Sequence, residues 1–120
     1  MDSADYSYSV KSEVSGFNEQ NPKDWIVALK ATIGKLKKKN KAAISRLNAI
    51  GIAGHMHGAT LLDKNGEILH PCILWNDTRS YKQASRLDRD VKLQEITGNI
   101  IFPGFTAPKL LWIQENKPEI

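Results

Sequence analysis

The sequence has a single cysteine, Cys72, and no run of about 18 apolar residues, the length that a membrane-spanning helix needs. One cysteine cannot form a disulfide within the chain, which fits a reducing compartment. Residues 1–10 are polar and lack the apolar core of a secretory signal. We therefore expect a cytoplasmic protein in which Cys72 is a small buried residue of a strand and not a reactive thiol.

The chain also has little excess charge. Its formal net charge is +4, and much of it lies in a short lysine-rich segment, residues 35–41. No aromatic residues or arginines are interleaved with these lysines, as they are on surfaces that bind nucleic acids. We therefore expect neither a nucleic-acid partner nor a membrane partner.

The lysine-rich segment comes at the end of a strong helix signal. Asn21 is a favourable N-cap, and Pro22 suits the first helical position. Lysines near the carboxyl end of a helix interact favourably with its dipole, so we interpret them as a solvated helix terminus. The apolar residues that recur at helical spacing are Trp25, Leu29, Ile33 and Leu36.

The remaining pattern predicts alternating strands and helices in one modest domain. A chain of 120 residues with 41% apolar residues can support a single core. Residues 1–14 alternate weakly, as in an edge strand or a mobile segment. The other predicted elements are a strand at 47–53, a hairpin at 59–69 with an Asn65-Gly66 turn, a strand at 72–75, a helix at 78–87, a short helix at 91–96 and a final helix from Thr106 to Pro118.

Two polar clusters follow predicted strands. Residues 54–58, Gly-His-Met-His-Gly, come after the strand at 47–53, and residues 75–79, Trp-Asn-Asp-Thr-Arg, come at the end of the strand at 72–75. Two strand ends in one sheet can converge, and glycines let the backbone turn and approach a ligand closely. The pattern predicts a small-ligand site built on a rigid sheet.

Three blocks carry a family resemblance. They are residues 51–63 (GIAGHMHGATLLD), 73–79 (ILWNDTR) and 96–120 (ITGNIIFPGFTAPKLLWIQENKPEI). In order and spacing they resemble the amino-terminal domain of bacterial xylulokinases, members of the FGGY carbohydrate kinase family. The resemblance implies an α/β domain of the ribonuclease-H-like (actin-like ATPase) fold.

The resemblance extends from residue 18 to residue 120. Residues 1–17 do not match the family's opening Asp-x-Gly-Thr hairpin. We therefore expect residues 18–120 to be a partial amino-terminal domain that lacks the first strands and the phosphate loop. Residues 1–17 are then an edge strand or a mobile segment.

The resemblance also implies an activity for the parent protein. Xylulokinases phosphorylate D-xylulose to D-xylulose 5-phosphate with ATP and Mg²⁺, and their catalytic aspartate and adenosine-binding loops belong to a later domain. We therefore expect no catalytic residue and no bound cofactor in this piece. Because such kinases depend on orientation and electrostatics, the piece is expected to supply the sugar-binding side and to be inactive alone.

Met56 and His57 are placed in the ketose pocket by the resemblance. Neutral imidazole both donates and accepts hydrogen bonds, as contact with a sugar hydroxyl requires. Two alternatives stay open for His57: a structural histidine, or a metal ligand with His55, for which no third ligand has convincing spacing. Glycerol kinases carry an Arg-Glu pair at the matching place, so xylulose is the better candidate, with ribulose and other ketoses or polyols left open.

The second cluster has two interpretations as well. Trp75 is either a flat apolar wall against the sugar or a core aromatic at a strand end. Asp77 either accepts a hydrogen bond from a sugar hydroxyl or caps the following helix, and Arg79 pairs with a carboxylate to fix the turn. The resemblance also places Asn99 and residues 102–105 along one side of the pocket.

An alternative to the kinase hypothesis is a non-catalytic module that keeps only sugar binding or serves in protein interaction. In either case, a sheet without its first strands has an unpaired edge and an uncovered apolar flank. Such an edge favours pairing with another chain. We therefore expect a homodimer or a swapped assembly.

Overall fold

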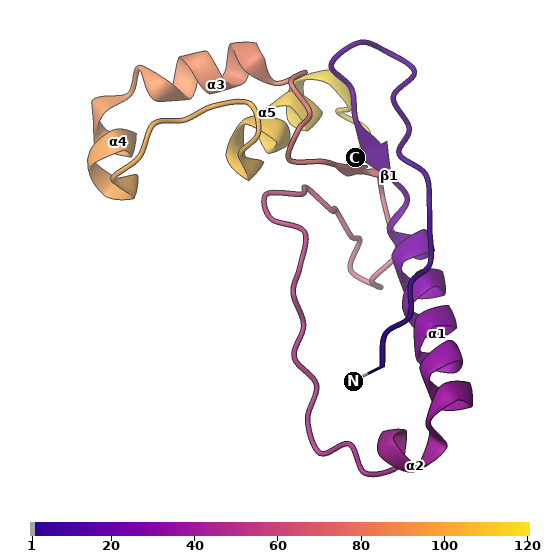
Figure 1. Cartoon of the computed structure of the whole chain (residues 1–120). Helices are drawn as coiled ribbons and strands as arrows, with labels where there is room; N and C mark the ends of the chain where they lie inside the picture. The colour runs from indigo at the N-terminus through magenta and orange to yellow at the C-terminus, as the bar shows by residue number, and fades with distance from the viewer. Residues whose placement is uncertain (1) are drawn as a thin grey trace. The chain divides into compact units, whose positions relative to one another are not determined.

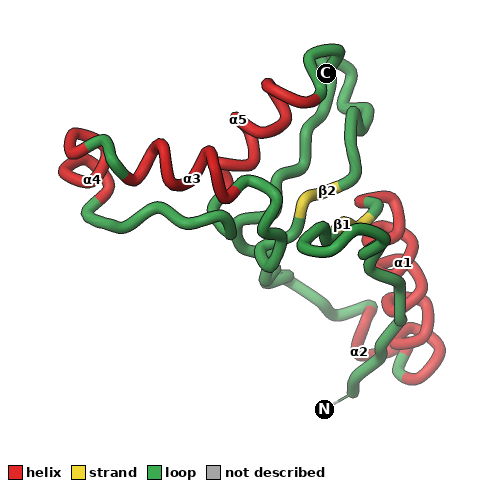
Figure 2. The backbone as a smooth tube through the Cα atoms, turned by 90° about the horizontal axis from the view of Figure 1, so that it is seen from above, coloured by secondary structure: helices red, strands yellow, loops and turns green. Residues whose placement is uncertain are grey.

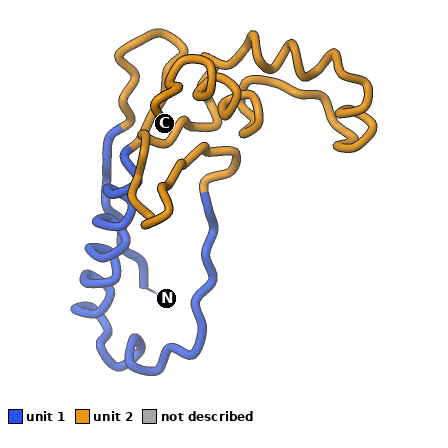
Figure 3. Tube along the Cα trace, turned by 180° about the vertical axis from the view of Figure 1, so that it is seen from behind, with its two compact units in different colours: residues 1–9, 21–54 blue, residues 10–20, 55–120 orange. Residues whose placement is uncertain are grey.

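The structure, a computed structural model, describes residues 2–120. Contacts within the chain divide it into two compact units, which are coloured separately in Figure 3. Unit 1 takes in the chain as far as Ser9 together with Asn21–Gly54, and unit 2 takes in Val10–Gln20 together with His55–Ile120. The two units therefore alternate along the sequence.

Helix α1, Pro22–Lys39, is the longest element of unit 1 (Figure 1). The side chain of its N-cap Asn21 accepts a hydrogen bond from the backbone N–H of Lys23 at 3.0 Å. Its last turn carries three lysines at residues 37–39, as the sequence predicted. The prediction of this helix is confirmed because capping and apolar spacing, both local properties, are enough to define it.

Asn40 ends α1 and begins the next helix. Its backbone N–H donates to the carbonyl of Leu36 at 2.9 Å, and its side-chain oxygen accepts from the N–H of Ala43 at 3.1 Å. The second bond caps α2, Lys41–Ile44. One asparagine thus satisfies backbone groups of both helices.

The strand predicted at residues 47–53 is wrong. These residues have no regular secondary structure, and within residues 2–120 none of them pairs with a strand. Ile50 and Ile52 are 78% and 90% exposed. Their apolar alternation is typical of a strand, but a strand also needs a neighbour for its backbone hydrogen bonds, and the described residues provide none here.

Unit 2 contains a two-stranded antiparallel sheet of β1, Glu19–Gln20, and β2, Cys72–Ile73 (Figure 2). Ile73 pairs with Glu19 on one side and, through an isolated bridge, with Ala59 on the other. A further isolated bridge joins Lys11 to Glu19. Residues 2–14, predicted as an edge strand or a mobile segment, form this one bridge and no strand. β2 is shorter than the strand predicted at residues 72–75.

The hairpin predicted at residues 59–69 forms through one antiparallel bridge. Asp63 closes its turn by accepting two backbone N–H bonds, each at 2.8 Å. Gly66 has a φ of 83°, whereas Asn65 does not have a positive φ. The turn therefore contains one left-handed residue, Gly66, and the Asp63 carboxylate tightens it in place of a second one.

Three helices complete unit 2. The helices predicted at residues 91–96 and 106–118 are confirmed to within a few residues. The helix predicted to begin at residue 78 begins later, because residues 78–80 form a turn in which the N–H of Tyr81 donates to the carbonyl of Thr78 at 3.2 Å. Within residues 2–120, no helix is both long and apolar enough to cross a membrane. The three helices are α3, Tyr81–Asp88, α4, Val91–Thr97, and α5, Thr106–Asn116.

The core of unit 2 joins β2 to α5. Ile73 and Ile113 are 0% and 3% exposed and form one cluster with Ala59. Trp112 packs against this cluster. Cys72 is fully buried beside it, and burial raises the pKa of its thiol, in agreement with its prediction as a small buried residue.

Replacing Asn21 with alanine removes the side-chain acceptor at the start of α1. We expect the free energy of unfolding to fall by about 1 kcal/mol, measured by urea denaturation followed by circular dichroism. Asn21→Asp is the matched control, because it keeps an acceptor and adds a negative charge at the helix amino terminus. Equal losses in the two variants would contradict a capping role.

Candidate functional site

His57 has an unusual backbone conformation. Its φ is 58°, and it is the one non-glycine residue with a positive φ in residues 2–120. Such a conformation is strained and persists only where the surroundings hold it. Lys109 Nζ donates to the His57 carbonyl oxygen at 2.6 Å, and the ring of Phe105 lies 4.8 Å from the imidazole, centroid to centroid. His57, which is predicted to contact the sugar, is therefore fixed by a hydrogen bond to its carbonyl and by a ring contact to its imidazole.

His55 joins the two polar clusters. The backbone N–H of Trp75 donates to His55 Nε2 at 3.3 Å. Burial and, to a smaller extent, the charge of Lys109 lower the pKa of His55, which favours the neutral imidazole, the form in which Nε2 can accept this bond. A Cβ at Gly58 would lie 2.7 Å from the His55 ring and 2.9 Å from the Cys72 sulfur, so glycine permits this approach.

The loop of residues 102–105 reaches the same place. A Cβ at Gly104 would lie 2.6 Å from the carbonyl oxygen of Trp75, so the two backbones approach closely. The ring of Phe102 lies 4.1 Å from that of Phe105, which in turn neighbours His57. The Phe105 ring thus contacts both the His57 imidazole and the Phe102 ring, and closure of one side of a pocket by this loop stays a prediction.

A buried lysine connects these loops. Lys109, on α5, is 0% exposed, and its Nζ donates to the carbonyl oxygens of His57 at 2.6 Å and Gly104 at 2.7 Å. Burial lowers the pKa of Lys109, and the negative charge of Asp77 opposes this shift. The sequence analysis did not identify this residue. A signal was present, since Lys109 lies four positions before the buried Ile113 and therefore on the same face of the helix.

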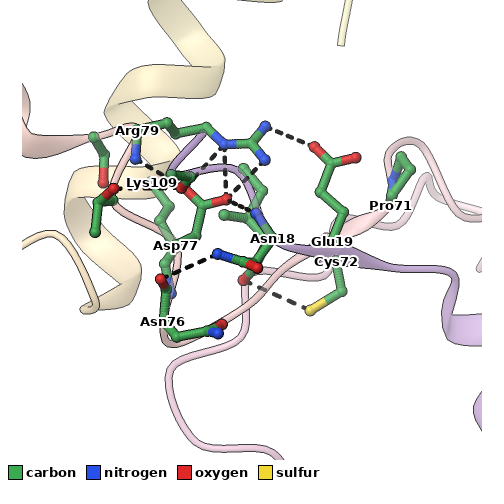
Figure 4. A network of polar contacts seen from close by, with 12 residues as sticks. Asn18, Glu19, Pro71, Cys72, Asn76, Asp77, Arg79 and Lys109 are labelled. Carbon is green, nitrogen blue, oxygen red and sulfur yellow. Dashed lines mark hydrogen bonds and ion pairs between the residues drawn. The ribbon is translucent and has the colours of Figure 1, made fainter. Parts of the chain in front are cut away.

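Asp77 and Arg79 form a buried ion pair, drawn in Figure 4. Arg79 Nη2 donates to Asp77 Oδ2 at 2.8 Å, and Arg79 Nε lies 3.0 Å from both carboxylate oxygens. Asp77 Oδ2 also accepts the backbone N–H of Asn18 at 2.6 Å, and Arg79 Nη1 pairs with Glu19 at 2.6 Å. The expected pairing of Arg79 with a carboxylate is confirmed, and both oxygens of Asp77 are already bonded within the protein.

The four predicted sugar-contact residues differ in accessibility. Met56 and Trp75 are 75% and 60% exposed, so Trp75 is not a core aromatic. Asp77 is 1% exposed. The segments of His57 and Trp75 lie together, whereas the Asp77 carboxylate faces its own ion-pair network, and a sugar contact by any of the four stays a prediction.

The chemistry of this arrangement is that of binding. The imidazole of His57 can donate or accept a hydrogen bond, and the aromatic rings beside it offer apolar contact to a carbon skeleton. Within residues 2–120, no three histidine, cysteine, aspartate or glutamate side chains are grouped as a metal site requires.

Comparison with known proteins identifies the family. The profile described as the FGGY family of carbohydrate kinases, N-terminal domain, matches residues 1–120, and the chain belongs to this family. It is 42% identical to the xylulose kinase of Lactococcus lactis over 94% of this chain and 23% of that protein. The chain thus spans about a quarter of the length of this relative.

Solved structures show the same relationship. The crystal structure of a "xyloylose kinase" from Brucella ovis matches with a TM-score of 0.91 and 49% identity, covering 92% of this chain and 23% of that one. A gluconate kinase from Lactobacillus acidophilus matches with a TM-score of 0.83 and 26% identity, covering 95% and 23%. These matches confirm the predicted fold class, an incomplete α/β domain of the actin-like ATPase type. The division of the chain at residue 17 stays a prediction.

Asp77→Ala is expected to lower the free energy of unfolding by about 3–5 kcal/mol, because it leaves the Arg79 guanidinium buried without its main partner. Arg86→Ala is the control, since it breaks an ion pair with Glu115 whose side chains are 60% and 40% exposed, and about 0–1 kcal/mol is expected. Denaturant unfolding of both variants measures the difference. Similar losses would argue against a special role for the buried pair.

Proposed function

We propose that this chain forms the sugar-binding side of an ATP-dependent carbohydrate kinase that phosphorylates D-xylulose to D-xylulose 5-phosphate. The observation that carries the proposal is the convergence of the His57 turn, the Trp75 backbone and the loop of residues 102–105. Membership of the FGGY family and similarity to the Lactococcus lactis xylulose kinase support the choice of activity and sugar.

In this proposal, each predicted residue has a physical task. His57 exchanges a hydrogen bond with a sugar hydroxyl, and the exposed side chains of Met56 and Trp75 cover the carbon skeleton. Asp77 serves the site chiefly by holding the turn after Trp75, because its oxygens are bonded to Arg79 and Asn18. A rigidly held pocket of this kind can orient one hydroxyl for phosphoryl transfer, which is a large part of catalysis in kinases.

ATP and Mg²⁺ are the cofactors of the proposed activity. The carboxylate of Asp77 is saturated by protein donors, and residues 2–120 hold no metal-ligand cluster. The cytoplasmic location expected from the sequence is part of the same proposal.

His57→Ala tests the sugar assignment. Loss of the proposed hydrogen bond to the sugar is expected to weaken D-xylulose binding by about 1–3 kcal/mol, or roughly 5- to 150-fold in Kd, measured by titration calorimetry. His70→Ala is the control because this histidine precedes β2, lies beside Glu19 and is outside the His57 turn. Gluconate and glycerol titrated in parallel measure selectivity.

The outcomes separate the candidates. Unchanged D-xylulose affinity in His57→Ala would remove this residue from the site, and tighter binding of gluconate than of D-xylulose would reassign the sugar. Sugar binding without ATP-dependent phosphorylation in the full-length gene product would favour the non-catalytic module.

We also propose that residues 47–53 pair with a second copy of the chain. Ile50 and Ile52 are largely exposed, and an unpaired apolar segment with strand character tends to acquire a partner. Sedimentation of the chain is therefore expected to show a dimer, and Ile52→Lys is expected to shift it towards monomer. A monomer at high concentration would contradict the proposal.

A further inference from the structure

Lys109 occupies a position where a hydrophobic residue is the simpler choice. It lies between Pro108, which is fully buried, and a turn of α5 that ends in the core residue Ile113. Burying an ammonium group is costly unless hydrogen bonds and nearby charge compensate it. A leucine or methionine at this position would avoid that cost, so the contacts of the ammonium group are the feature to explain.

The ammonium group bonds to two loops and to no regular element. Its acceptors are the carbonyl of His57, 52 positions away in sequence, and the carbonyl of Gly104, five positions away. Asp77 contributes favourable charge, but its oxygens already accept from Arg79 and Asn18. Nζ is therefore a bridge between two backbone carbonyls, at 2.6 and 2.7 Å.

Each of these carbonyls belongs to a conformation that needs support. His57 is in the left-handed region, so the direction of its carbonyl is coupled to the direction of its side chain. Gly104 approaches the Trp75 carbonyl so closely that no Cβ fits. Phe105, which follows Gly104, places its ring 4.8 Å from the imidazole of His57. A change in the distance between the two carbonyls would therefore move the imidazole relative to Phe105.

We propose that Lys109 is a positioning residue of the sugar site, whose ammonium group sets the spacing of the His57 turn and the loop of residues 102–105. It does not touch the sugar. It fixes the orientation of the His57 imidazole against the Phe105 ring, and thereby the width of the pocket between the two loops. The effect on sugar affinity rests on the proposed function, whereas the effect on the imidazole does not.

The first experiment needs no sugar. The imidazole resonances of His57, assigned by their loss in His57→Ala, are recorded in the full chain and in Lys109→Met, Lys109→Arg and Gln83→Met. Gln83 is the matched control, a buried side chain that donates a hydrogen bond to Glu115 and so links α3 to α5. Lys109→Met is expected to shift the His57 resonances by losing the ring current of Phe105, Lys109→Arg by less, and Gln83→Met not at all. An unshifted His57 in folded Lys109→Met would overturn the proposal.

The second experiment measures the wild-type chain, so it holds even if the variants fail to fold. With nitrogen-15 in lysine, the Nζ protons of Lys109 are expected to exchange with water at least tenfold more slowly than those of the exposed lysines. They are also expected to show couplings to carbon-13 in the carbonyls of His57 and Gly104. Fast exchange of every lysine ammonium group would overturn the proposed bridge.

The third experiment adds D-xylulose. Lys109→Met is expected to raise Kd by at least tenfold, Lys109→Arg to recover part of this loss, and Gln83→Met to stay within about twofold of wild type. A His57 shift without any sugar binding by the wild type would leave the bridge standing and defeat the proposed function. Normal affinity in Lys109→Met, with wild-type binding intact, would overturn the positioning role.

Discussion

A buried carboxylate and guanidinium pair is the interaction on which unit 2 depends. Asp77 receives the backbone N–H of Asn18, and its partner Arg79 extends to Glu19 of β1 (Figure 4). The same guanidinium lies 3.9 Å from the ring centroid of Phe17 and 5.0 Å from that of Trp112 on α5. One cation thus joins the segment before α1, the turn after β2 and the last helix. A buried pair of this kind is weak evidence for net stability, and in some proteins it fixes one geometry, which is what a ligand site requires.

The buried pair of Asp77 and Arg79 also positions the candidate site. The turn fixed by Asp77 presents Trp75, whose N–H meets His55 and whose carbonyl meets Gly104. Lys109 adds a second buried cation, bonded to backbone carbonyls and not to the carboxylate that Arg79 occupies. The backbones of these loops are therefore held in place by bonds to two side chains, His55 and Lys109.

Much of the fold follows from short-range signals. The cap at Asn21 and the repeat of apolar residues specify α1. The hairpin turn at residues 63–66 is likewise specified by its own residues, Asp63 and Gly66. Residues 47–53 show where such signals fail. Their alternation expresses a preference for extended backbone, but a strand is completed by hydrogen bonds from a neighbour that the described residues do not contain.

The sequence alone determined α1, α4, α5, the family and the two polar clusters, because capping, periodicity and motif spacing depend on residues that are close together in the chain. Tertiary structure alone decided what each polar group does. Trp75 remains exposed and Asp77 is enclosed although they are two positions apart. The left-handed backbone of His57 and the buried ammonium group of Lys109 stabilise each other through a hydrogen bond, which forms only because folding brings together segments 52 positions apart. The reason is energetic, since the cost of burying a charge or straining a backbone depends on partners that folding brings from elsewhere in the chain.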